Sequence, residues 1–148
     1  MFKPEVKQKV HNNNIYFTVY WSLIKKTDKY EINNNVPSVS GIYELYYQDK
    51  NKKLNLFFFA RAWYGGLRNN IRERSDPELE RNAQRKKILT DYDCYYRYSQ
   101  ISSLADMADL YYFFACTYFP DSKDVHSSER YDNIYVKETS AEKVIDIF

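Results

Sequence analysis

Residues 41–74 read GIYELYYQDKNKKLNLFFFARAWYGGLRNNIRER, and this stretch decides which fold the chain is expected to adopt. Alternating residues predict a strand over 42–48, and the apolar run 54–62 predicts the strand that returns beside it. The polar residues between these strands are too many for a two-residue turn, so a looser loop is expected. All three glycines of the chain lie in this stretch, and the adjacent pair predicts a tight turn into a short basic helix over 67–74.

A helix, a strand and a second helix are expected to follow. Ser75 and Glu78 have the spacing of a capping box, which predicts a helix that runs to about Leu89. Alternating tyrosines predict a strand over 92–101. Apolar residues at helical spacing then predict a buried helix over 104–119.

The patterns near the two ends of the chain are less decisive. Residues 15–26 fit a strand and a helix face equally well, whereas 27–40 are polar and are expected to form a loop. Near the C-terminal end, 133–137 read as an edge strand and 141–148 as a short helix.

Together these elements predict a single domain of the α+β class, with one small, mostly antiparallel sheet flanked by helices. Its core is expected to be 41–120, and 1–40 and 121–148 are expected to be extensions. Apolar residues make up 44% of the 148-residue chain and aromatic residues 18%, which is ample material for a hydrophobic core.

Cysteine usage and hydropathy bear on the compartment. Cys94 and Cys116 sit in apolar patterns without the spacing of metal ligands, as expected of reduced thiols in a reducing compartment. Residues 1–10 lack the apolar segment of a signal peptide, and the longest apolar runs are too short to span a bilayer. We therefore expect a soluble, cytoplasmic protein with no membrane partner.

Charge is distributed unevenly along the chain, although the net charge is only +2. Residues 61–87 hold eight basic and four acidic side chains, a net charge of +4. Solvated helix faces would explain this excess, and so would a basic surface that binds phosphate, which makes nucleic acid a candidate partner. The candidate nucleic-acid contacts outside the motifs below are Arg61, Arg68, Arg81, Arg85, Lys86 and Lys87.

The motifs in this stretch resemble those of the GIY-YIG nuclease domain. Gly41-Ile42-Tyr43 matches the first motif, and Tyr64-Gly65-Gly66 is the best match to the second. The family then has an asparagine, an aliphatic residue, a basic residue and an arginine at fixed places, which are filled here by Asn70, Ile71, Arg72 and Arg74. The resemblance covers about 41–120 and implies a GIY-YIG-like fold.

The resemblance also implies a chemistry, the hydrolysis of phosphodiesters with one divalent cation, Mg²⁺ or Mn²⁺. Tyr43 and Tyr64 would assist the attacking water, and Arg74 together with Arg72 would stabilise charge in the transition state. The family's metal ligand is a glutamate on a later helix, where this chain has Asp109. Aspartate is one methylene shorter and would displace the cation by about 1 Å, which can cost on the order of 100-fold in rate.

Two functions are therefore expected from the sequence. The first is a metal-dependent endonuclease, and the second is a catalytically inactive module of the same fold that binds nucleic acid or a protein through 61–87. The candidate residues also have structural interpretations: the tyrosines as sheet aromatics, Arg74 as an ion-pair partner of Glu78, and Asp109 as an acid on the solvent side of its helix.

Overall fold

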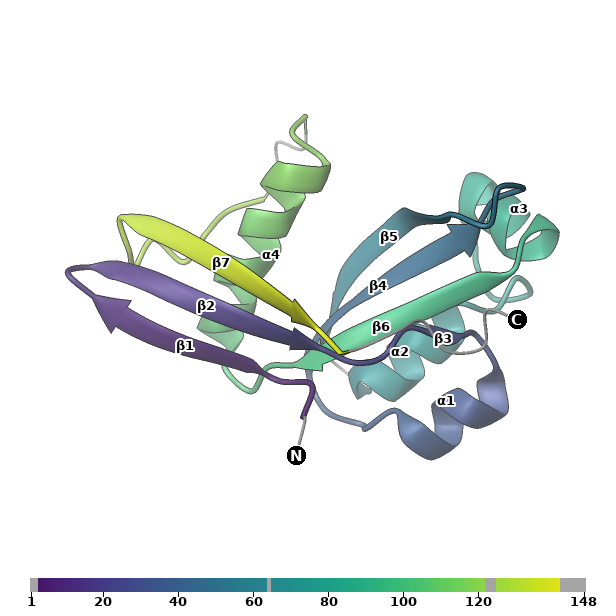
Figure 1. Cartoon of the computed structure of the whole chain (residues 1–148), viewed down its shortest axis with the longest axis horizontal. Coiled ribbons are helices and arrows are strands. Elements are labelled where there is room, and N and C mark those ends of the chain that lie inside the picture. Colours follow the sequence, from purple (N-terminus) through teal and green to yellow (C-terminus); the bar gives the residue numbers. More distant parts are fainter. Residues whose placement is uncertain (1–2, 64, 122–124, 142–148) are drawn as a thin grey trace.

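The computed structural model describes residues 3–63, 65–121 and 125–141, which form two sheets and the helices around them. In chain order the elements are β1 (Val6–His11), β2 (Asn14–Trp21), β3 (Lys25–Lys26), α1 (Lys29–Asn35), β4 (Gly41–Gln48), β5 (Leu54–Ala62), α2 (Gly66–Arg74), α3 (Ala83–Asp91), β6 (Cys94–Gln100), α4 (Leu104–Tyr118) and β7 (Asn133–Ser140). The strand orders are β1-β2-β7 and β3-β6-β4-β5, and α4 lies with the first sheet whereas α1, α2 and α3 lie with the second (Figure 1). The fold is α+β, as expected, but it has two sheets and not one.

The four-stranded sheet contains the predicted hairpin. β4 pairs with β5 and with β6, both antiparallel, so β4 is the central strand. The side chain of Asp49 closes the loop between β4 and β5, because its Oδ1 accepts hydrogen bonds from the backbone N–H groups of Asn51 and Lys53, at 2.8 and 3.0 Å. The strands over 42–48 and 54–62 and the looser loop between them are thus confirmed.

The glycine turn fixes α2 against the segment before β4. Gly66 has a φ of 73°, and a Cβ atom there would lie 2.6 Å from the carbonyl carbon of Ser38, so only glycine fits. The next residue, Leu67, donates its backbone N–H to the carbonyl oxygen of Val39 at 2.8 Å. Gly41 is equally restricted, because a Cβ atom on it would lie 2.3 Å from the carbonyl oxygen of Ser99. Packing alone therefore accounts for glycines in both motifs.

Two predictions between β3 and β6 were wrong. The expected loop over 27–40 contains α1, because Asp28 caps the helix by accepting from the N–H groups of Tyr30 and Glu31, and Ile32 is buried below it. The expected helix from Ser75 to Leu89 begins only at Ala83, because the backbone N–H of Ser75 completes the last turn of α2 and Asn82 caps α3 instead.

The three-stranded sheet joins the two ends of the described chain. β1 and β2 form a hairpin whose turn residues, Asn12 and Asn13, have φ values of 48° and 64°, a conformation that asparagine tolerates well. Residues 15–26 are therefore mostly strand. β7 runs parallel to β2 at the edge of the sheet, which confirms the predicted edge strand. The helix predicted for 141–148 falls, apart from its first residue, outside the described residues.

The two faces of β4 face different parts of the core. Ile42 belongs to the cluster formed by α4 and the three-stranded sheet, whereas Tyr43 and Leu45 belong to the cluster below α1 and α2. Because side chains alternate along a strand, this central strand separates the two clusters. The predicted helix over 104–119 is confirmed as α4, with Ser103 as its N-cap. Within the described residues, no helix is both long enough and apolar enough to cross a bilayer.

Candidate functional site

Tyr43, the tyrosine of the first motif, is completely buried. It is 0% exposed and packs at 6.0 Å between ring centroids against Phe58 of β5. Its hydroxyl makes no hydrogen bond of ordinary geometry within the described residues. Burial raises the pKa of this phenol, and the charge of the Arg74 guanidinium only partly opposes the rise. A phenol in this environment stays protonated and has no access to a water molecule from bulk solvent.

Glu80 lies on the same side of the sheet and was not selected from the sequence. It is 3% exposed, in the turn between α2 and α3. Its Oε2 accepts from Arg85 Nε at 3.1 Å, and its Oε1 accepts from the backbone N–H of Asn82 at 3.0 Å. Arg74 Nη1 lies 3.7 Å from Oε1. Desolvation works to raise the pKa of Glu80, but these hydrogen bonds and positive charges outweigh it and lower the pKa, so the carboxylate is ionised.

Two arginines are held over one aromatic ring by this carboxylate. The guanidinium carbons of Arg74 and Arg85 lie 6.0 and 4.7 Å from the centroid of Phe58. The side chain of Arg74 is still 47% exposed. Beside it lies a hollow of about 360 Å³ lined by Glu73, Arg74, Leu79 and Arg81. We call these residues, together with Glu80 and Arg85, the Glu80 cluster. The expected pairing of Arg74 with Glu78 does not occur, because α2 ends at Arg74.

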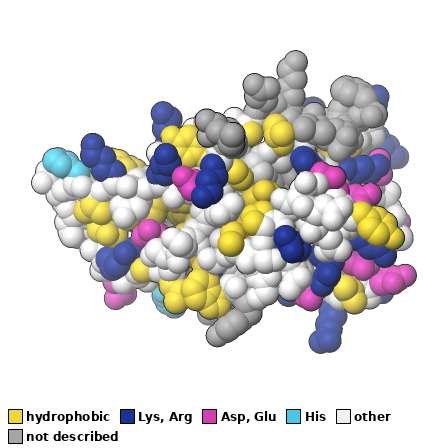
Figure 2. Space-filling view, turned by 90° about the horizontal axis from the view of Figure 1, so that it is seen from below, with side chains coloured by type: hydrophobic (Ala, Val, Ile, Leu, Met, Phe, Trp, Pro, Cys, Tyr) yellow, Lys and Arg dark blue, Asp and Glu magenta, His cyan; other side chains and the backbone are white. Residues whose placement is uncertain are grey.

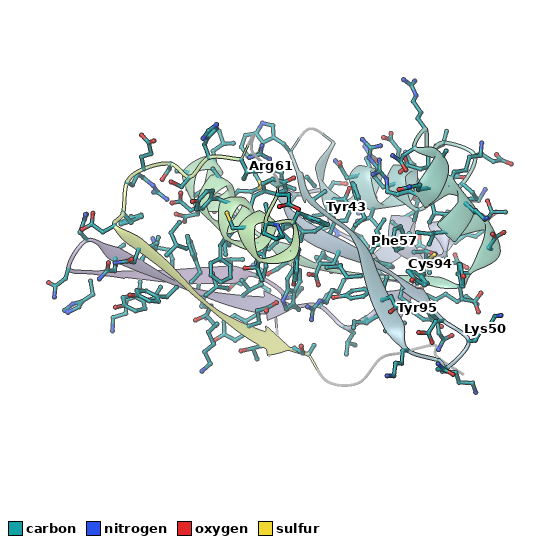
Figure 3. All side chains as sticks on the ribbon, turned by 90° about the horizontal axis from the view of Figure 1, so that it is seen from above. Tyr43, Lys50, Phe57, Arg61, Cys94 and Tyr95 are labelled. Carbon is teal, nitrogen blue, oxygen red and sulfur yellow. The ribbon has the colours of Figure 1, made fainter. Side chains whose placement is uncertain are left out.

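The other basic residues of 61–87 do not form one continuous surface with this cluster. Arg61 lies on the opposite face of the sheet, where its guanidinium carbon is 4.6 Å from the ring centroid of Tyr111 in α4 (Figure 3). Arg68 donates from Nε to the carbonyl oxygen of Val36 at 2.7 Å and so ties α2 to α1. Arg72 is half-buried on α2, whereas Lys86 and Lys87 are exposed on α3. On the face seen in Figure 2, Lys and Arg side chains are spread out among acidic ones.

Asp109 lies away from Tyr43 and Arg74. It is 1% exposed and not on a solvent-facing side, since the segment before β7 covers it. Its oxygens accept from the backbone N–H of Ser128 at 2.7 Å, from Ser128 Oγ at 2.9 Å and from Arg130 Nη2 at 2.7 Å. It sits on α4, which packs on the opposite face of β4 from Tyr43.

The donor set does not fit a divalent cation. Both oxygens of Asp109 accept hydrogen bonds from Ser128 or Arg130. The carboxylate that pairs with Arg74 is that of Glu80, which is already neutralised by two guanidiniums. A cation at Glu80 would meet two positive charges. Among the described residues, no group of three His, Cys, Asp or Glu side chains is placed to hold a metal ion. Tyr64, the second expected phenol, lies outside the described residues.

A second buried carboxylate, Glu44, holds the two sheets together. It is 0% exposed and accepts from Arg97 Nε at 2.6 Å, from the hydroxyl of Tyr118 at 2.9 Å and from that of Tyr46. Arg97 Nη2 also lies 3.6 Å from Oε1 of Glu138 in β7. Both oxygens of Glu44 accept hydrogen bonds, and Arg97 and Tyr118 link it to β6 and α4, so we assign it a structural role.

Comparison with known proteins gives a family without a stated activity. Residues 5–147 match the model of a protein family described as "Uncharacterised protein". The chain belongs to this family. No curated protein and no solved structure matches the chain. The resemblance to the GIY-YIG domain and the geometry of the side chains therefore carry the functional argument.

Proposed function

We propose that this protein is a GIY-YIG-like module that binds the phosphate groups of nucleic acid on the α2–α3 surface and does not cleave them. The observation that carries the proposal is the Glu80 cluster, in which one buried carboxylate orients two arginines beside an open hollow. Arg74 keeps about half of its side chain exposed there, and Arg81 lines the same hollow.

Such an arrangement suits phosphate recognition. A guanidinium presents its donors in a planar fork that matches two phosphate oxygens, and an arginine that is already held in place loses less conformational entropy on binding. Glu80 and Phe58 restrain Arg74 and Arg85 in this way, Glu80 by ion pairs and Phe58 by its ring. A third arginine, Arg81, lines the hollow together with Arg74 and adds to its positive charge.

The burial of Tyr43 and the position of Asp109 favour binding over catalysis. Hydrolysis of the implied kind needs a phenol that reaches water and a carboxylate that reaches a cation on the same side of the sheet. Tyr43 is sealed in the core, and Asp109 belongs to the opposite face. Gly41 and Gly66 are required by packing alone, so their presence in the motifs does not by itself require the activity.

The endonuclease is the second candidate, and one observation favours it. Tyr43 and Arg74 both lie against Phe58, with the Tyr43 ring centroid and the Arg74 guanidinium carbon each 6.0 Å from its ring centroid. Arg74 Nη1 also lies 3.7 Å from Oε1 of Glu80, which would take the place of Asp109. Cleavage assays with Mg²⁺ and with Mn²⁺ separate this candidate from the first.

The test of the proposal is fluorescence anisotropy with a labelled 20-base-pair duplex between 50 and 200 mM salt. Arg81→Gln should weaken binding and reduce the slope of log K against log salt by about 0.9, the value for one lost phosphate contact. Arg61→Gln is the matched control, because it removes the same charge from the opposite face. Equal affinity of the two variants, or no binding at 50 mM salt, would overturn the proposal.

A further inference from the structure

Within the part of the chain that the structure describes, no helix or strand packs on the outer face of the three-stranded sheet. Residues of β2 alternate strictly, with Ile15, Phe17, Val19 and Trp21 buried toward α4 and the residues between them facing outward. The strand registers carry this alternation to β1 and β7. The outward positions are Lys7, Lys9, His11, Asn14, Tyr16, Thr18, Tyr20, Asn133, Tyr135, Lys137 and Thr139, which we call the tyrosine face.

The tyrosine face is built from few kinds of residue. It contains three tyrosines and three lysines, together with asparagine, threonine and histidine, and it contains neither an aliphatic nor an acidic residue. Glu5, which lies just outside β1, is neutralised by Lys3 at 3.3 Å. A partner that fits this face must therefore be negatively charged and must offer flat groups rather than aliphatic ones.

The aromatic rings are arranged as a stacking platform. Tyr16 and Tyr135, on neighbouring strands, have ring centroids 5.0 Å apart and planes inclined by only 15°. They remain 41% and 48% exposed. β7 is an edge strand of its sheet, so no further strand from the described residues lies beyond Tyr135. On the other side of the pair, Lys9, His11 and Tyr16 line a hollow of about 360 Å³.

Positive charge lies beside these rings. Lys7 Nζ is 5.7 Å from the ring centroid of Tyr20, farther along the same face. Lys9 is the direct neighbour of Tyr16 across the β1–β2 pair, and Lys137 follows Tyr135 two residues later on β7. Aromatic rings interleaved with lysines on an open sheet are the arrangement by which proteins stack unpaired bases and neutralise the backbone beside them.

We propose that the tyrosine face binds single-stranded nucleic acid, with bases stacked on Tyr16 and Tyr135 and phosphates contacted by Lys7, Lys9 and Lys137. A duplex hides the faces of its bases within its own stack and cannot use the rings. A second copy of this chain would bring two faces of the same positive charge together, which disfavours it as the partner. This surface is separate from the α2–α3 surface and does not depend on it.

The experiment measures anisotropy of fluorescein-labelled 12-nucleotide dT and rU strands, with a labelled hairpin duplex for comparison. The intact protein should bind the single strands, with a log–log salt slope of about −2 for three lysine contacts. Tyr135→Ala should weaken binding by roughly 5- to 150-fold, the range for one lost stacking contact. Tyr135→Phe keeps the ring and should bind within about twofold of wild type.

The controls separate this proposal from a loss of fold and from the α2–α3 surface. Tyr30→Ala removes a tyrosine that is 71% exposed on α1 and should not alter binding. Arg81→Gln should weaken duplex binding, and Tyr135→Ala should weaken single-strand binding by the same factor whether or not Arg81→Gln is also present, because the two surfaces are separate. The proposal is overturned if single strands fail to bind at 50 mM salt or if Tyr135→Ala binds as tightly as Tyr30→Ala. It is also overturned if sedimentation shows a dimer that Tyr135→Ala dissociates.

Discussion

Removal of the Tyr43 hydroxyl should stabilise the protein, although the same change at a half-buried tyrosine, Tyr118, should destabilise it. Tyr43→Phe deletes a buried hydroxyl that makes no hydrogen bond of ordinary geometry within the described residues. A buried polar group without a partner costs about 1–3 kcal/mol, and the small void left behind returns part of that. We expect a net gain of about 1 kcal/mol in the free energy of unfolding, or about 2–4 °C in Tm for a chain of this size.

Tyr118→Phe is the matched control. Its hydroxyl donates to the carboxylate of Glu44 at 2.9 Å, and a hydrogen bond to a charged group contributes about 1.5–3 kcal/mol. Because Tyr118 is only half-buried, we expect a loss near the lower end, about 1.5 kcal/mol, and a Tm lower by about 3–6 °C.

Urea denaturation followed by tryptophan fluorescence measures both changes, and an unchanged m-value shows that the midpoints report stability. Opposite signs for the two variants would support a purely structural Tyr43. If Tyr43→Phe loses as much stability as Tyr118→Phe, the hydroxyl has a partner that stabilises the native state, and the reasoning fails.

Three further predictions concern the Glu80 cluster, the glycine turn and Asp109. Glu80→Gln should cost about 2 kcal/mol at pH 7, less than the 3–5 of a fully buried pair because both arginines reach solvent. Folding lowers the pKa of Glu80 below its ordinary 4.5, so the stabilisation is present above about pH 4.5 and disappears as the pH falls. The urea midpoints of Glu80→Gln and of wild type should therefore converge in acid. Gly66→Ala should cost at least about 2 kcal/mol by the same assay, from its positive φ and the close approach to Ser38. Asp109→Asn should lower Tm in calorimetry, because Arg130 loses its buried partner. Millimolar Mg²⁺ should leave the wild-type Tm unchanged. A rise in Tm with Mg²⁺ that Asp109→Asn abolishes would instead identify Asp109 as a metal ligand.

Strong local periodicity was sufficient to predict the central hairpin, α2, β6 and α4. The residues 29–35 were missed because their helix is short and rich in asparagine, and only the buried Ile32 and the Asp28 cap identify it. The second sheet was missed because β7 pairs with β2 across more than a hundred residues, a contact that no local pattern contains.

The candidate site illustrates the same limit. Glu80 stands in a charged stretch where solvent exposure is the natural interpretation. It is instead paired with two arginines from two helices, and both of these lie over Phe58 of β5. Asp109 of α4 was expected to face solvent. Its backbone partner, Ser128, lies 19 residues later in the sequence, so the local pattern gave no sign of the contact. Contacts of this kind follow from packing and were not available to motif spacing.

Simultaneous measurement of binding and cleavage tests the central claim most directly. A labelled duplex is incubated with the protein and Mg²⁺ or Mn²⁺, and anisotropy and gel analysis are read from the same sample. The account predicts salt-sensitive binding that Arg81→Gln weakens, with the duplex intact throughout. Cleavage products that appear with metal and vanish with Arg74→Ala would contradict it and establish the endonuclease instead.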